Sequence, residues 1–292
     1  MKHTTEQLLF AYGRGERDFR HWELADVDLS AAQLQDALFD GANLAQARLS
    51  AATLTNAHLS GANLQGAVLD SVDLRGADLG GCDLRHADLT GANLTDANLE
   101  GAHLDGVRMP HAILIMANLS HASLRGANLR QSLLMGCNVQ AADLRLASLI
   151  GADVEYARLI ESDLTECELD WASMMNARMQ HACLSKARLE GADLRMANLS
   201  GADLTDAVLT CAVLRESDLS RARLQRADLR SADLRQADLS FADVTDTQMK
   251  GAILTNARLE GTNVDEAQRL GADVAWERLS SQGLRTELGE GD

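Results

Sequence analysis

The feature that most constrains this chain is a period of five residues. From Phe19 to Val264, every fifth position holds Leu, Val, Met or Phe, which makes fifty consecutive apolar positions without a shift of register. Two residues before each of them lies a second column that is mostly Ala, with exceptions that are chiefly small, such as Cys82 and Ser132. Asp or Asn stands between the two columns in about half of the units. A repeat this regular indicates a repeat architecture.

The spacing predicts which side chains face inward. Residues two apart on an extended strand point to the same side, so the two columns face the interior together. A period of five fits neither a 3.6-residue helix nor a straight strand, and the chain must therefore turn after each short extended piece. Its coils then stack as a solenoid with a core of Leu and Ala. The aromatic content of 3% agrees, because large rings would overpack such a lattice.

Local sequences such as Gly91-Ala-Asn-Leu-Thr and Gly201-Ala-Asp-Leu-Thr resemble the A(D/N)LXX unit of the pentapeptide-repeat family, over about residues 18–265. The resemblance implies an all-β fold, a right-handed quadrilateral β-helix with four units per coil and about twelve coils. We expect three parts: a helical cap over residues 1–17, the β-helix over 18–265, and a helical cap with a flexible tail over 266–292. The apolar layers at the two ends of a solenoid would otherwise be exposed to solvent, and caps of this kind cover them.

Each predicted cap has local signals. Thr4 and Gln7 form a capping-box pattern, and Gly13 can end the helix that follows. Trp22 falls in the small-residue column, where it can fill the first coil. At the other end, apolar residues of the tail can seal the last coil; a C-terminal dimer interface is the rival interpretation. These apolar residues are Leu270, Val274 and Leu279.

The charge and the hydrophobic pattern limit the partners. The formal net charge of −16 disfavours direct nucleic-acid binding, which depends on clustered Lys and Arg. Eighteen of the fifty units carry Asp or Glu just before the central residue, so much of this charge belongs to the repeat itself. No stretch approaches eighteen apolar residues, and no secretory signal is present, which predicts a cytoplasmic protein without a membrane span. Export by a signal-independent route stays open.

Candidate chemistry is sparse. Cys82, Cys137 and Cys167 lie in the small-residue column and are expected to be buried, whereas Cys183 and Cys211 fall at outward positions. No Cys-x-x-Cys pair exists, and the eight His residues lack the spacing of a metal site. Familiar catalytic and phosphate-binding motifs are missing as well. We therefore expect no enzyme activity, no cofactor and no metal.

One group of outward positions is apolar. With four units per coil, units twenty residues apart stack on one side, and the side centred on Leu114, Leu134, Val154 and Met174 carries hydrophobic residues where other sides carry polar ones. An exposed apolar patch of this kind usually marks an interface. We predict that it binds a protein partner, with a foreign protein and a homodimer both open. The patch residues are Ile113, Ile115, Met116, Leu133, Met135, Tyr156, Trp171 and Met175, with Leu146, Ile150 and Ile160 as neighbours.

Two functions follow from these expectations. The first is a non-catalytic scaffold or adaptor that presents a rigid surface, in the manner of family members that accompany bacterial secretion systems. The alternative is a DNA mimic that binds DNA gyrase or another topoisomerase and modulates or protects it, as other members of the family do. Arg195, Arg215 and Arg235 would interrupt a continuous negative surface on one side, which counts against mimicry.

Overall fold

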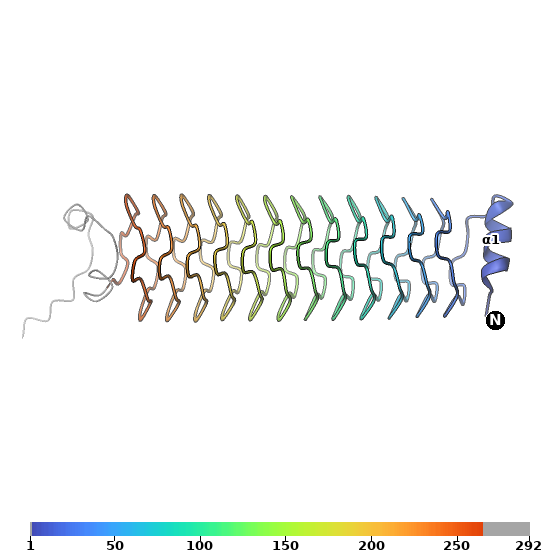
Figure 1. The fold of residues 1–292 in the computed structure, drawn as a ribbon, viewed down its shortest axis with the longest axis horizontal. Coiled ribbons are helices and arrows are strands. Elements are labelled where there is room, and N and C mark those ends of the chain that lie inside the picture. Colours follow the sequence, from blue (N-terminus) through green and yellow to red (C-terminus); the bar gives the residue numbers. More distant parts are fainter. Residues whose placement is uncertain (1, 265–292) are drawn as a thin grey trace, which may run out of the picture.

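The protein is a straight rod with a short helix at one end (Figure 1). The structure is a computed structural model, and it describes residues 2–264. Helix α1 spans Thr5–Gly13, and the chain then winds into stacked coils that continue to Val264. The predicted C-terminal cap, with Leu270, Val274 and Leu279, lies outside the described residues.

The coils are joined by single-residue β-bridges. Each bridge is parallel and links a residue to the one twenty positions later, from Asp18 with Leu38 to Asp238 with Arg258. Four five-residue units therefore complete each coil, and the register holds along the whole rod. An additional bridge between Lys2 and Glu23 attaches the residues before α1 to the first coil.

The backbone hydrogen bonds of one unit explain its composition. In the unit 73–77, Asp73 donates to the previous coil (2.9 Å), and Leu74 and Gly76 donate to the next coil (2.8 and 2.9 Å). Ala77 donates to Leu74 and closes a four-residue turn (3.0 Å). The remaining N–H, that of Arg75, is donated to the Asp73 carboxylate (N···Oδ1 3.2 Å). The acidic or amide residue of the repeat thus accepts the one N–H that no neighbouring coil can accept.

Each turn places its third residue in the left-handed region. Every corner residue from His21 to Gly261 has φ between 53° and 75°, as a type II turn requires at this position. Glycine fills only some of these corners. The others are mostly polar residues, together with Ala and a few large apolar side chains.

The interior is one continuous hydrophobic core from Leu8 to Val264. Both columns face inward as predicted, and from residue 18 onward their residues are buried except for the half-buried Trp22 and Ala32 near the start of the rod. The buried hydroxyl groups of the small-residue column find carbonyl partners: Ser132 Oγ donates to the Leu129 oxygen (2.6 Å), and Thr247 Oγ1 donates to the Leu224 oxygen (2.7 Å). Polar residues are therefore tolerated in the small-residue column when the turn carbonyl is within reach.

Helix α1 closes the first coil. The Thr4 hydroxyl accepts the Gln7 N–H (3.3 Å), and the Gln7 side chain accepts the Thr4 N–H (2.9 Å), so the expected capping box is present. Leu8 is fully buried against the coil below. Trp22 is half-buried and meets Phe19 edge-on (centroids 5.1 Å apart). These aromatic rings fill the first coil in place of the Leu and Ala that follow.

The four sides of the rod can be named after their first central residues. In chain order they are the Leu24, Leu29, Leu34 and Phe39 sides, after which the next coil begins with Leu44. An edge, formed by the corner residues, separates each side from the next. The predicted patch lies on the Leu34 side and its two edges.

A candidate protein-binding surface

The structure divides the predicted patch between a flat side and two edges. Five of its residues lie on the flat Leu34 side: Ile113, Ile115, Leu133, Met135 and Met175. Met116 and Tyr156 lie on the edge between the Leu34 and Phe39 sides, which we call the Met116 edge. Trp171 lies on the opposite edge of the same side.

The contacts are closest around Met116. Ile113 and Leu133 form a β-bridge, and the Met116 N–H donates to the Met135 carbonyl (3.0 Å). A Cβ atom at Gly136 would lie 2.7 Å from Met116 Sδ, which shows that the Met116 side chain covers this glycine in the next coil. Met116 is nevertheless 62% exposed, and Leu133 and Met135 are each 39% exposed. These residues form an unbroken apolar surface over two coils.

In the next two coils, polar and charged residues interrupt the apolar patch. Asp153 and Glu155 occupy the Leu34 side beside Tyr156, and Ser173 follows them. Ser173 donates to Glu155 Oε1 (2.7 Å). On the far edge the Trp171 ring lies over Gly191, where an added Cβ would meet it at 2.4 Å. Trp171 is therefore exposed but separated from the Met116 edge by polar groups.

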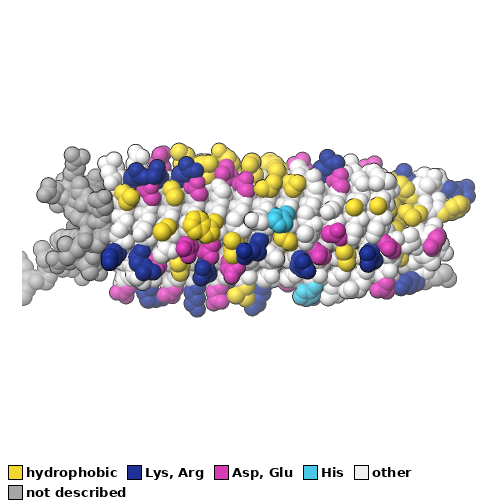
Figure 2. Space-filling view, in the orientation of Figure 1, with side chains coloured by type: hydrophobic (Ala, Val, Ile, Leu, Met, Phe, Trp, Pro, Cys, Tyr) yellow, Lys and Arg dark blue, Asp and Glu magenta, His cyan; other side chains and the backbone are white. Residues whose placement is uncertain are grey.

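Two residues, Leu146 and Met196, lie elsewhere than the sequence predicted or were not predicted as part of the patch. Leu146 lies on the edge between the Leu24 and Leu29 sides, so it does not flank the patch; Ile150 and Ile160 lie on the two adjoining sides. Met196 is 51% exposed and belongs to the Met116 edge. Its signal was in the sequence, because Met116, Tyr156 and Met196 are spaced by forty residues, or two coils. Figure 2 shows hydrophobic side chains gathered along the upper edge of the middle of the rod.

Beyond the patch, the Leu34 side carries compensated charges. Arg195 pairs with Asp193 (2.5 Å), and the Arg215 and Arg235 guanidinium groups share Asp233 (2.5 and 2.6 Å). The arginines that were expected to interrupt a negative surface are thus ion-paired on this side. Similar pairs recur elsewhere on the rod, and the Arg145 side chain holds the pKa of Asp143 below its usual range.

The cysteines and histidines show no sign of a reactive centre. Cys82, Cys137 and Cys167 are buried as expected, and burial raises the pKa of each thiol. Cys183 is half-buried and Cys211 is exposed. Within residues 2–264, no group of three His, Cys, Asp or Glu side chains is arranged to hold a metal ion.

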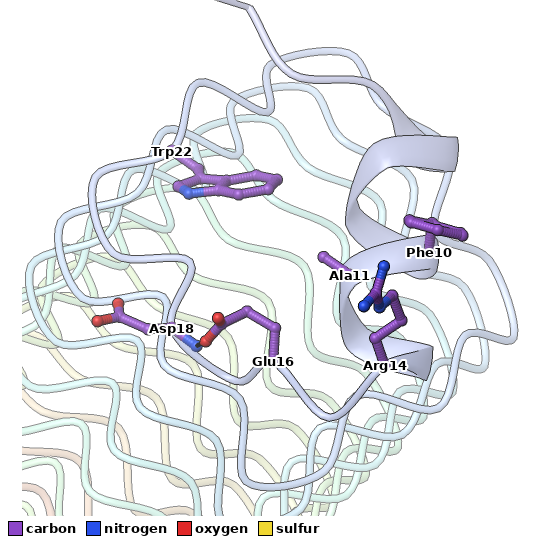
Figure 3. Close-up of a pocket in the computed structure, with 6 residues that line it drawn as sticks. All are labelled: Phe10, Ala11, Arg14, Glu16, Asp18 and Trp22. Carbon is purple, nitrogen blue, oxygen red and sulfur yellow. Dashed lines mark hydrogen bonds between the residues drawn. The ribbon is translucent and has the colours of Figure 1, made fainter.

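A shallow pocket lies between α1 and the first coil (Figure 3), lined by Phe10, Ala11, Arg14, Glu16, Asp18 and Trp22. Its carboxylates already have partners. Glu16 Oε1 accepts the N–H groups of Arg17 and Asp18 (both 2.9 Å), and Arg20 pairs with Asp18 (2.6 Å). The Arg20 side chain lowers the pKa of Asp18 to about 2. The carboxylates of this pocket are thus bonded within residues 16–20, where the chain leaves α1 and enters the first coil.

Comparison with known proteins agrees with the architecture. A family model described as pentapeptide repeats (8 copies) matches overlapping segments of the chain, from residues 23–61 to residues 232–268. The chain belongs to the pentapeptide-repeat family. The fold is therefore the right-handed quadrilateral β-helix of that family, as predicted.

Several solved pentapeptide-repeat structures are similar. HetL, a protein involved in heterocyst differentiation regulation from the cyanobacterium Nostoc sp. strain PCC 7120, is 33% identical, and the alignment covers 90% of this chain and 98% of HetL (TM-score 0.42). Full-length QnrB1, a plasmid-mediated fluoroquinolone resistance protein, is 20% identical over 71% of this chain and 93% of QnrB1 (TM-score 0.29). Rfr23 from the cyanobacterium Cyanothece 51142 is 25% identical over 46% of this chain and 65% of Rfr23 (TM-score 0.26). A search of curated proteins found no match.

Among residues 2–264, no helix is both long enough and apolar enough to cross a membrane.

Proposed function

We propose that this pentapeptide-repeat protein is a non-catalytic scaffold that binds protein through the apolar patch of the Leu34 side and the Met116 edge. The observation that supports it most directly is the exposure of Met116, Leu133 and Met135 side by side on a rigid surface. Continuous apolar surface of this kind favours association. Methionine side chains adapt their shape to a partner.

The rigidity of the rod also supports a scaffold. Each unit exchanges backbone hydrogen bonds with the coils before and after it, and the columns stay in register from Asp18 to Arg258. A surface held in this way loses little conformational entropy when a partner binds. The patch is therefore prepared for binding before the partner arrives.

The test is capture of partners from a lysate of the source organism, with the wild-type protein beside a double variant, Leu133→Asp with Met135→Asp. A matched control, Leu146→Asp with Phe241→Asp, places the same charges on exposed apolar residues outside the patch. All three proteins must first show the same thermal melting curve. We expect the wild type and the control to capture a protein that the patch variant loses. If the patch variant captures the same protein, the proposal is wrong.

The identity of the captured protein distinguishes between the two more specific roles that the family suggests. A secretion component would support the accessory role, and a topoisomerase would support the gyrase-directed role. The second role needs a long negative surface, whereas Arg195, Arg215 and Arg235 pair with the carboxylates of the Leu34 side. The apolar patch accordingly supports the scaffold better than the mimic.

A further inference from the structure

The Met116 edge runs along the rod with apolar side chains at regular heights. Its corner residues include Met116, Tyr156 and Met196, with Gly136 and Asn176 between them. All three apolar residues are more than half exposed. Four coil spacings separate the first from the last, which is about 19 Å at about 4.8 Å per spacing.

Beside Tyr156, the two flanks of this edge carry opposite charges, and within residues 2–264 none of these side chains forms a salt bridge. Asp153 and Glu155 precede Tyr156 on the Leu34 flank. The Asp153 carboxylate accepts the Glu155 N–H (3.1 Å), and the Glu155 carboxylate accepts the Ser173 hydroxyl (2.7 Å). Arg158 and Arg178 lie on the Phe39 flank. Among the described residues, Arg158 reaches only the Gln140 amide oxygen (3.4 Å), and Arg178 has no side-chain hydrogen bond or ion pair.

The arginine pair is unusual for this rod. Arg158 and Arg178 are β-bridge partners in adjacent coils, so two like charges occupy neighbouring positions, an arrangement that destabilises a ladder. Arg215 and Arg235, which lie twenty residues apart on the Leu34 side, are by contrast compensated by Asp233. Two arginines without a carboxylate partner, in a chain with a net charge of −16, point to an acidic group supplied by a binding partner.

We infer that the occupant of the Met116 edge is a second copy of this chain, packed side by side and parallel, with the two-fold axis along the rod. This arrangement sets the Leu34 flank of one copy against the Phe39 flank of the other at the same height. Glu155 of each protomer then faces Arg158 of its partner, and the apolar corner residues meet their own copies. The inference rests on the proposed function, because it names the partner of that same surface.

Two other pairings of two copies leave these charges unmatched. An antiparallel dimer centred on Tyr156, the register that brings Met116 against Met196, sets each Phe39 flank against itself, so Arg158 meets its own copy and Arg178 meets Asn138. Parallel packing of two flat Leu34 sides sets Asp153 against Glu155, which is a repulsion. Of these three arrangements, only the parallel edge-to-edge dimer sets Glu155 against Arg158, and a closed two-fold contact of this kind is self-complementary.

Cysteine cross-linking tests the geometry. In a Cys211→Ser background, Met116→Cys, Tyr156→Cys and Met196→Cys are made as single variants, with Leu146→Cys on the opposite edge as the control. We expect mild oxidation to give a disulfide-linked dimer for each of the three edge variants and none for the control. An antiparallel dimer would cross-link at one of the three positions only, and a monomer at none; either result would overturn the inference.

Charge reversal tests the chemistry by sedimentation equilibrium. Arg158→Glu is expected to weaken dimerisation at least tenfold, and the double variant Glu155→Arg with Arg158→Glu is expected to restore it, because the exchanged charges pair again. A double variant that stays as weak as the single one would contradict the pairing. If the chain is monomeric and the patch variant still loses a captured foreign protein, this inference fails while the proposed scaffold function stands.

Discussion

At the residue scale, the acidic or amide residue before each central position has a specific structural task. Asp73 accepts the N–H of Arg75, and Asn93 accepts the N–H of Thr95 (3.1 Å) in the same way. These oxygen atoms complete the hydrogen bonding of the turn. The negative charge of the protein is thus partly a by-product of backbone satisfaction, as the composition had indicated.

Asp88 offers a test of this task. Its Oδ1 accepts the Thr90 N–H (3.0 Å) and the Thr90 hydroxyl (2.5 Å), and both donors are partly buried. Asp88→Ala leaves them without this acceptor and should lower the free energy of unfolding by about 1 to 2 kcal/mol. Asp88→Asn keeps the acceptor and should lose less than half of that. Urea unfolding of the three proteins measures the difference, and equal losses would show that the charge matters more than the turn.

The corner residues show a second constraint at this scale. From His21 to Gly261 they all have positive φ, and none of them is Val, Ile, Thr or Pro. β-Branched side chains clash with the backbone in the left-handed region, and proline cannot reach it. The corner composition therefore follows from steric limits, even where the corner is exposed and carries no interaction.

Ala51 is an exposed corner at which this steric cost can be measured. Ala51→Gly should raise the free energy of unfolding by up to about 1 kcal/mol, because glycine adopts φ of 53° without the Cβ clash. Ala51→Val should lower it by about 1 to 3 kcal/mol. Thermal melts give the order of the three proteins. A valine variant as stable as wild type would mean that the corner relaxes out of the left-handed region.

At the scale of the coil, stability comes from layers that continue into the neighbouring coils. Leu144 is 1% exposed in the middle of the rod, and the interior above and below it is filled by the same column. A coil cannot bury its own inner face without its neighbours, so damage in one layer spreads along the solenoid. This dependence makes the interior less tolerant than any single contact suggests.

Leu144→Asp is expected to unfold several coils, because it places a charge without a partner among apolar side chains and costs more than about 4 kcal/mol. Leu144→Met nearly conserves volume and should cost less than about 1.5 kcal/mol. Far-UV circular dichroism during heating distinguishes these outcomes. An aspartate variant that melts with the wild type would show that the residue does not face inward.

At the scale of the whole molecule, the paired carboxylates make stability depend on acid. Arginines two residues further along lower the pKa of Asp73, Asp83, Asp143 and Asp228 in the folded state. The unfolded chain therefore binds more protons than the folded one as pH falls through the usual aspartate value of 3.8. This stabilisation is complete above that value and disappears as pH falls through the lowered folded values.

We expect the melting temperature to be nearly constant from about pH 7 to about pH 5 and to fall below about pH 4. Melting curves recorded across this range provide the measurement. A melting temperature that rises on acidification would show that relief of the repulsion within a net charge of −16 outweighs the lost ion pairs.

The sequence predicts the fold better than the surface. The fifty apolar positions predicted the inward columns, because burial follows directly from a fixed period, and the family resemblance implied the four units per coil. The patch residues were also placed on one side by arithmetic. The separation of Trp171 from the rest required the positions of Asp153, Glu155 and Ser173, and the open arginine pair required knowing which carboxylates are already bound. Side-chain pairing depends on contacts across coils, which a period does not specify.

The unbroken twenty-residue ladder has one further consequence. Residue number acts as a coordinate system on this rod: the remainder after division by twenty gives the direction in which a side chain points, and the quotient gives its height. Duplication or deletion of twenty residues would lengthen or shorten the rod and leave every downstream side chain facing the same way. Insertion or deletion of five residues would turn the whole downstream surface by a quarter of a circle. The residues of the Met116 edge would then lie on two different edges of the rod.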